Sequence, residues 1–300
     1  MGTRRRRRSL DDRGIKKGDT RRPSSAVCTL LPRRLELQVR FALGHDTEIL
    51  RAESWNDLDR LIKKRALRAV ILDPATEDSA DNDRVVRLFT RYPSLPVVAY
   101  VSLDAARFNA VTRLSRVGLE HVVLHRYDDA PERFREIIER ATADPLVHRV
   151  LDSIRPALER LPLELSIAVE NLLREPHRYH AALDLHSDTS YSTLQLYQHF
   201  RSARLASPRT FVIAARALRA YSYLRDPGYS VLDVTDKLGY HQPRILTNHA
   251  LMVFGLTPGR ARRRLSEQQA VKRVLAFLHS GGRSAARRVP RGAREKGSAA

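Results

Sequence analysis

The stretch VLDVTDKLGYHQPRILTNHALMVFGLTPGRAR, Val231–Arg262, decides the fold of the C-terminal part of the chain. Its apolar residues recur first at helical spacing and then meet Gly239, where a helix would stop. Pro243 suits the first turn of a second helix, because proline has no backbone N–H to satisfy there. The pattern therefore predicts a helix, a short glycine turn and a second helix that ends at Gly255. The second helix of such a unit can enter the major groove of DNA.

The residues before this stretch predict a second unit of the same kind. Ser192 is a candidate N-cap, since its hydroxyl can accept a hydrogen bond from a free N–H of a helix over 193–204. Residues 209–224 are rich in alanine and leucine, which favour a long helix. An Asp-Pro-Gly turn at 226–228 ends that helix. We therefore expect two helix-turn-helix units joined by a long helix.

Two units in this register resemble the AraC/XylS family of transcription regulators. The residues that carry the resemblance are Ser192, Leu196, Phe200, Ser207, Pro208, Arg216, Ala220, Tyr223, Leu224, Val231, Gly239, Tyr240, Gly255, Leu256, Thr257, Pro258 and Arg262. The chain departs from the family pattern where Gln198 and Asn248 each replace an arginine. The resemblance implies that the second helix of each unit enters one of two successive major grooves, about 10 bp apart on one face of the DNA.

The resemblance also places the residues that would meet base edges. They are Thr193, Leu194, Gln195 and Gln198 in the first unit, and Pro243, Arg244, Ile245 and Asn248 in the second. An asparagine or glutamine can bond adenine bidentately, and Arg244 can bond guanine in the same way. The alternative is that some of these side chains face solvent or bond phosphates, which fix register without reading sequence. Candidates for phosphate contacts, or for structural roles, are Arg216, Arg260 and Arg262.

The N-terminal part of the chain alternates short apolar runs with amphipathic stretches. Strands are expected at 26–31, 47–52, 69–72, 95–101 and 121–124, and helices at 35–43, 55–66, 82–91, 105–117 and 131–143. This alternation predicts a parallel sheet covered on both faces, a flavodoxin-like doubly wound domain. Its order and size resemble the receiver domain of response regulators, in which a strand-end aspartate accepts phosphate. Asp73 stands at that position.

The other parts of a receiver site are largely replaced. Residues 31–34 read Leu-Pro-Arg-Arg where receivers have the acidic pair that holds Mg²⁺, and residues 125–127 read His-Arg-Tyr where receivers have a lysine. Ser102 matches the receiver hydroxyl. Phosphoryl transfer needs a cation to neutralise the charge that develops on the phosphate oxygens. Asp73 is therefore expected to be structural, in a degenerate receiver that acts through protein contacts or an unknown ligand.

Charge is distributed unevenly along the chain. The net charge is +20, of which residues 1–25 carry +7 and residues 201–300 carry +15, while residues 26–200 carry −2. Such clustering favours a polyanionic partner. We expect a disordered basic arm at 1–24, the receiver-like domain at 25–145, a helical linker at 146–176, the DNA-binding domain at 177–265, and a helical extension with a basic disordered tail at 266–300.

Several functional classes are disfavoured. Cys28 is the only cysteine, which excludes an internal disulfide and fits a reducing cytoplasm. No apolar run approaches a membrane span, and no catalytic motif is present. Three nearby histidines, at 177, 180 and 186, are expected to be packing or solvated residues. We expect no enzyme activity, cofactor or metal.

The expected function is therefore a cytoplasmic, sequence-specific transcription regulator that binds double-stranded DNA. A second copy of the chain and RNA polymerase are the protein partners considered. Two alternatives stay open: a two-component response regulator controlled by phosphorylation of Asp73, and a non-specific nucleic-acid-binding protein led by the basic tails.

Overall fold

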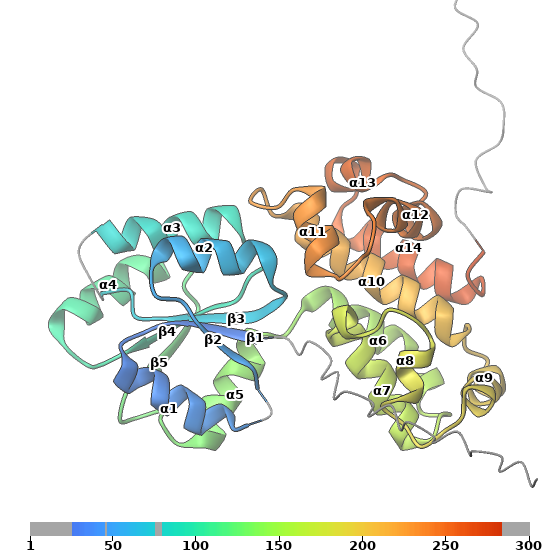
Figure 1. Ribbon diagram of the computed structural model, residues 1–300, viewed down its shortest axis with the longest axis horizontal. Coiled ribbons are helices and arrows are strands. Elements are labelled where there is room, and N and C mark those ends of the chain that lie inside the picture. The colour runs from blue at the N-terminus through green and yellow to red at the C-terminus, as the bar shows by residue number, and fades with distance from the viewer. Residues whose placement is uncertain (1–25, 46, 76–79, 284–300) are drawn as a thin grey trace, which may run out of the picture.

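The computed structural model describes residues 26–45, 47–75 and 80–283. The basic arm at 1–24 and the tail at 284–300 lie outside the described residues. The chain forms an α/β domain followed by an all-helical domain (Figure 1).

The N-terminal domain is a five-stranded parallel sheet in the order β2-β1-β3-β4-β5. Its elements are β1 (Ala26–Leu30), α1 (Arg33–Leu43), β2 (Ile49–Arg51), α2 (Trp55–Lys64), β3 (Leu67–Leu72), α3 (Ala80–Arg91), β4 (Val97–Val101), α4 (Ala105–Ser115), β5 (His121–Leu124) and α5 (Pro131–Ala141). The strand order is that of flavodoxin-like folds. This confirms the fold class expected from the sequence.

Both faces of the sheet are covered by helices, as the buried apolar strands require. Helices α1 and α5 cover one face and α2 and α3 cover the other (Figure 1). Local signals set the helix starts: the Ser54 hydroxyl accepts a hydrogen bond from the Asp57 N–H at 3.2 Å, and the Asp104 carboxylate accepts one from the Arg107 N–H at 2.9 Å.

The C-terminal domain is a bundle built around one long central helix. Its elements are α6 (Pro145–Leu158), α7 (Leu163–Arg174), a 3₁₀ turn (Pro176–Arg178), α8 (Leu183–His186), α9 (Thr193–Ser202), α10 (Pro208–Arg225), α11 (Val231–Lys237), α12 (Pro243–Phe254), α13 (Pro258–Arg264) and α14 (Glu267–His279). Helix α10 is buried along nearly its whole length. Helices α6 and α7, within the residues expected to form a helical linker, pack into this same core.

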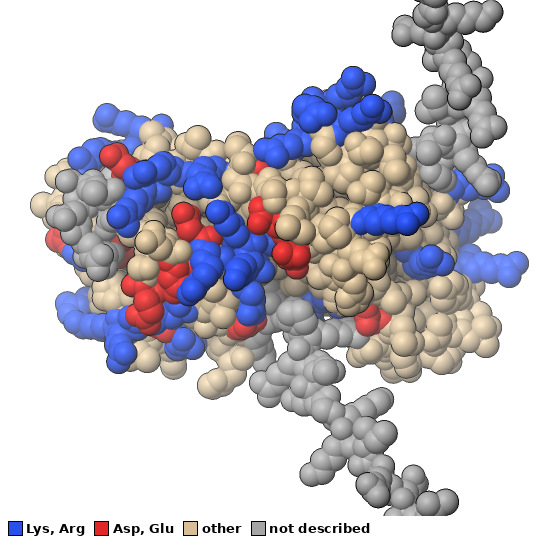
Figure 2. Space-filling model, turned by 45° about the horizontal axis from the view of Figure 1, so that its top comes forward, with Lys and Arg blue, Asp and Glu red and all other residues tan. Residues whose placement is uncertain are grey.

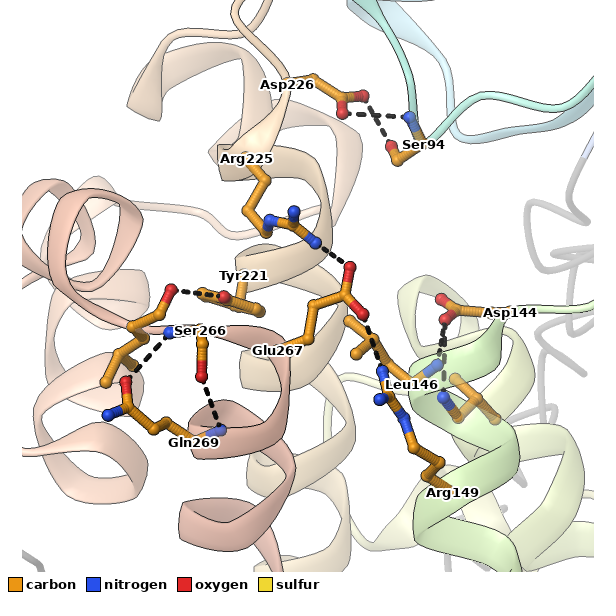
Figure 3. Close-up of polar contacts among 12 residues, drawn as sticks. Ser94, Asp144, Leu146, Arg149, Tyr221, Arg225, Asp226, Ser266, Glu267 and Gln269 are labelled. Atoms are coloured by element: carbon orange, nitrogen blue, oxygen red, sulfur yellow. Dashed lines mark hydrogen bonds and ion pairs between the residues drawn. The ribbon is translucent and has the colours of Figure 1, made fainter. Parts of the chain in front are cut away.

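The two domains share a hydrophobic core. One cluster joins Leu58 and Ile62 of α2 and Leu88 of α3 to Val234 and Leu238 of α11. Hydrogen bonds reinforce this junction: the Ser94 N–H and hydroxyl donate to the two carboxylate oxygens of Asp226, at 3.0 and 2.6 Å (Figure 3). The Gly228 N–H donates to the Arg91 carbonyl at 2.8 Å. The second helix-turn-helix unit is therefore packed directly against the N-terminal domain.

Candidate DNA-binding surface

The first helix-turn-helix unit consists of α8 and α9. Ser192 caps α9 through a capping box, in which its hydroxyl accepts from the Gln195 N–H at 3.4 Å and the Gln195 side-chain oxygen accepts from the Ser192 N–H at 2.8 Å. Leu196 and Phe200 are buried, which fixes the inner face of the helix. The N-cap expected at Ser192 is confirmed, and the Gln195 oxygen is committed to it.

The second unit consists of α11 and α12. Gly239 ends α11 with φ +63°, and a Cβ there would lie 2.7 Å from His180 Cε1, so the tight turn depends on glycine. Helix α12 begins at Pro243 and ends at Gly255, which adopts the left-handed conformation with φ 65°. The structure thus contains the two helices and the glycine turn that the opening stretch predicts.

All eight predicted base-reading residues are exposed on the structure. They are Thr193, Leu194, Gln195, Gln198, Pro243, Arg244, Ile245 and Asn248. The residues interleaved with them, Leu196 in α9 and Leu246 and Ala250 in α12, are buried. Each helix therefore anchors one face in the core and leaves its N-terminal half accessible. An exposed helix face of this kind can be inserted into a major groove.

Of the two roles considered for Arg216, its surroundings favour the structural one. Only 2% of this residue is exposed, and its guanidinium donates to the carbonyls of Tyr179 at 2.8 Å and Leu238 at 2.9 Å. It also lies 4.0 Å from the centre of the Tyr240 ring. Because its donors face the interior, Arg216 joins the segment before α8 to the turn of the second unit and is not available to phosphate.

The other two phosphate candidates differ from each other. Arg262 is half-buried and donates to the carbonyls of Tyr229 and Asp226, both at 3.3 Å. Arg260 is exposed, as are Arg263 and Arg264 on the same short helix α13. Figure 2 shows Lys and Arg side chains gathered along the upper edge of the C-terminal domain, where α13 lies in Figure 1. Helix α13 packs against α12, so these exposed arginines lie on an element next to the second unit.

The Asp73 carboxylate is fully buried at the end of β3 and is engaged by a cation. Arg107 contacts one oxygen through Nε and Nη2, both at 2.9 Å, and the Ala75 N–H donates to the other at 3.0 Å. Ser102 is half-buried. At the receiver lysine position, His125 Nδ1 lies 2.8 Å from Asp129 Oδ2. Both oxygens of the Asp73 carboxylate are thus hydrogen-bonded within the domain, one of them by an arginine.

Three other kinds of feature bear on function: a reactive cysteine, a metal site and a membrane-spanning helix. Burial raises the pKa of the Cys28 thiol to about 12, which keeps it protonated. Among the described residues, no group of three or more His, Cys, Asp or Glu is placed to hold a metal ion. Nor does any helix within these residues have the length and apolar character to cross a membrane.

The sequence of the C-terminal domain has recognisable relatives. Residues 185–264 match the family model described as a helix-turn-helix domain. These residues form an AraC-type helix-turn-helix domain. The AraC-type domain covers both units and the long helix between them, so the resemblance seen in the sequence is confirmed. It is a DNA-binding domain of the kind found in transcription regulators.

No curated protein matches the chain. A similar solved structure is full-length FixJ from B. japonicum, which is 14% identical, with 76% of this chain and 97% of that chain covered. The TM-score of this match is 0.36, which is too low to show that the two proteins share a fold.

Sequence reasoning missed the role of Lys237. The residue is 4% exposed, and its ammonium donates to the carbonyls of Ile62 and Arg65 in the other domain, both at 2.6 Å. Burial lowers the pKa of this lysine to about 7. The one hint in the sequence is that Lys237 stands next to the apolar residue Leu238. An exposed lysine at the end of a helix has the same pattern, so the sequence does not predict that Lys237 is buried.

Proposed function

We propose that the chain is a sequence-specific transcription regulator whose helices α9 and α12 enter successive major grooves on one face of DNA. The observation that carries the proposal is the exposure of all eight predicted base-reading residues within an AraC-type domain. Both helices pack on α10, which is buried in the core. A rigid connection of this kind suits two helices that must meet grooves about 10 bp apart.

Within this proposal, Arg244 and Asn248 are the principal readers on α12. Both are exposed, and they lie one helical turn apart on the same face. Arg244 suits guanine O6 and N7, and Asn248 suits adenine N6 and N7. On α9, Gln198 is exposed and has the same capacity for adenine, whereas the side-chain oxygen of Gln195 is used in the capping box.

For the N-terminal domain, we propose a degenerate receiver that acts through its contacts with the AraC-type domain. Support comes from the ion pair between Asp73 and Arg107 and from the buried residue Leu31 where receivers carry an acid. Support also comes from the core shared between α2, α3 and α11. On this proposal the ion pair between Asp73, after β3, and Arg107 of α4 stabilises the N-terminal domain. The N-terminal domain in turn fixes the position of the second helix-turn-helix unit.

The experiment is selection of bound duplexes from a random pool, followed by a shift assay on the selected sequence. Arg244→Ala should weaken binding by about 1–3 kcal/mol and relax the preference at one base pair. Arg260→Ala is the matched control, because loss of an exposed arginine that only contacts phosphate should weaken binding equally on all sequences. Equal loss on all sequences for Arg244→Ala would contradict its base-reading role. If an excess of unrelated DNA displaces the selected duplex from the protein, the binding is non-specific.

A further inference from the structure

We propose that the last turn of α2, in the N-terminal domain, is an additional DNA contact in which Lys63 and Lys64 hold phosphates flanking the segment read by α12. This inference rests on the proposed entry of α12 into a major groove. It assigns to the receiver-like domain a direct part in DNA binding. The partner is the phosphate backbone of the same duplex.

The position of these lysines follows from the junction between the domains. The Lys237 ammonium, at the end of α11, donates to the Ile62 and Arg65 carbonyls at 2.6 Å. The last turn of α2 therefore lies beside the turn that begins at Gly239 and leads into α12. In helix-turn-helix complexes the first helix crosses the DNA backbone while the start of the second meets base edges. Phosphates are thus expected to pass close to this turn.

Helix α11 cannot supply the cations that such a crossing needs. Its sequence VLDVTDK contains two acids, Asp233 and Asp236, and one lysine. Lys237 is buried and committed to the carbonyls of α2, while Asp236 is exposed. An exposed carboxylate would repel phosphate. Cations for the backbone at this point would therefore come from a neighbouring element. Helix α11 packs against α10 and α12 in its own domain and against α2 in the N-terminal domain.

Lys63 and Lys64 are the uncommitted cations of that helix. Arg60 pairs with Asp57 at 2.5 Å and Arg65 with Glu48 at 2.6 Å, whereas no described acid pairs with either lysine. Basic residues in a last turn often serve the free helix carbonyls, but here Lys237 takes two of the carbonyls in this region.

Both lysines are at least partly accessible to solvent. Lys64 is exposed and Lys63 half-buried. Figure 2 shows Lys and Arg side chains gathered on the N-terminal domain beside the junction, with a few acidic side chains between them and the C-terminal domain.

The junction holds these lysines at a fixed place relative to α12. The Tyr92 and Tyr229 rings pack with centroids 4.7 Å apart, and the Asp226–Ser94 and Gly228–Arg91 hydrogen bonds lie beside them. Ordering a mobile domain on binding costs affinity. Because the junction already fixes the N-terminal domain, binding through Lys63 and Lys64 avoids that cost.

The test measures how binding to the selected duplex depends on salt. The logarithm of the binding constant falls as the logarithm of the salt concentration rises, and each phosphate contact steepens that fall by about 0.9. The double variant K63Q/K64Q should make the slope less steep by about 2. The matched control is R33Q/R34Q, which removes two exposed cations from the start of α1, on the side of the N-terminal domain away from the C-terminal domain (Figure 1), and should leave the slope unchanged. Thermal unfolding of each variant checks that the fold is retained.

A second arm locates the contact on the DNA. Ethylation of individual phosphates should interfere with binding of the natural chain at positions beside the α12 half-site, and K63Q/K64Q should lose that interference alone. Equal slopes and equal interference patterns for the natural chain and K63Q/K64Q would overturn this inference and leave the proposed function standing. If the natural chain shows no sequence preference at all, the proposed function fails, and this inference fails with it.

Discussion

Gly228 lies in the domain junction at a point with no room for a side chain. Its N–H donates to the Arg91 carbonyl at 2.8 Å, and a Cβ built on it would lie 2.2 Å from Tyr92 Cε1 and 2.7 Å from two further ring atoms. Tyr92 is 1% exposed and packs against Tyr229, so its ring has no free space to enter. Gly228→Ala must therefore push the two domains apart locally.

The cost can be worked from these contacts. Forcing an extra methyl group into a packed site costs about 1–3 kcal/mol. Loss of the Gly228–Arg91 hydrogen bond adds about 1 kcal/mol. We expect Gly228→Ala to lower the free energy of unfolding of the docked protein by about 2–4 kcal/mol. The backbone at Gly228 does not have a positive φ, so the cost arises from the junction rather than from strain in the turn.

Urea unfolding followed by the fluorescence of Trp55, the only tryptophan, measures this change because Trp55 lies on α2. Gly259→Ala is the matched control: its Cβ would meet only Arg263 Nη1 at 3.7 Å, and replacing a helical glycine should stabilise by up to about 1 kcal/mol. Unchanged stability of Gly228→Ala, or an equal loss in Gly259→Ala, would refute the packing argument.

Two further predictions concern buried charges. Burial lowers the pKa of Lys237 from 10.5 to about 7, so the folded state binds this proton less tightly and the free energy of unfolding should rise between pH 7 and about 9. Above that pH, ionisation of the Cys28 thiol in the unfolded chain opposes the rise, because burial raises the pKa of this thiol in the folded state. Urea unfolding should show a steeper rise from pH 7 to about 9 in the natural chain than in Lys237→Met. Incubation with a small phosphodonor should leave the intact mass of the protein unchanged, because the Asp73 carboxylate is paired with Arg107. One phosphate per chain, absent in Asp73→Asn, would show that the receiver is active instead.

The fold was largely predictable because its signals are local. The strands of a parallel sheet are buried on both faces and appear as short apolar runs. Ser192, directly before α9, marks the start of that helix, because its hydroxyl accepts a hydrogen bond from the Gln195 N–H three residues further on. Helix α13 was not expected as a separate element, because a short arginine-rich segment has little apolar periodicity. The exposure of the eight base-reading candidates also follows from periodicity, since Leu196 and Leu246 had to face inward.

The roles of Arg216 and Lys237 could not be predicted in the same way. Each is a cation whose partners are carbonyls distant in sequence: Tyr179 and Leu238 for Arg216, and Ile62 and Arg65 for Lys237. Carbonyl acceptors leave no residue-type signal, so a buried cation of this kind looks like a surface cation in the sequence. The family resemblance gives the position of Arg216 but not its burial.

The central claim is that α9 and α12 read two successive major grooves. Methylation interference on the selected duplex tests it most directly, because methylation of guanine N7 blocks contacts in the major groove. We predict two clusters of interference on one face of the DNA, about 10 bp apart, with the cluster assigned to α12 weakened in Arg244→Ala. A single cluster, or interference that is the same on unrelated duplexes, would contradict the account.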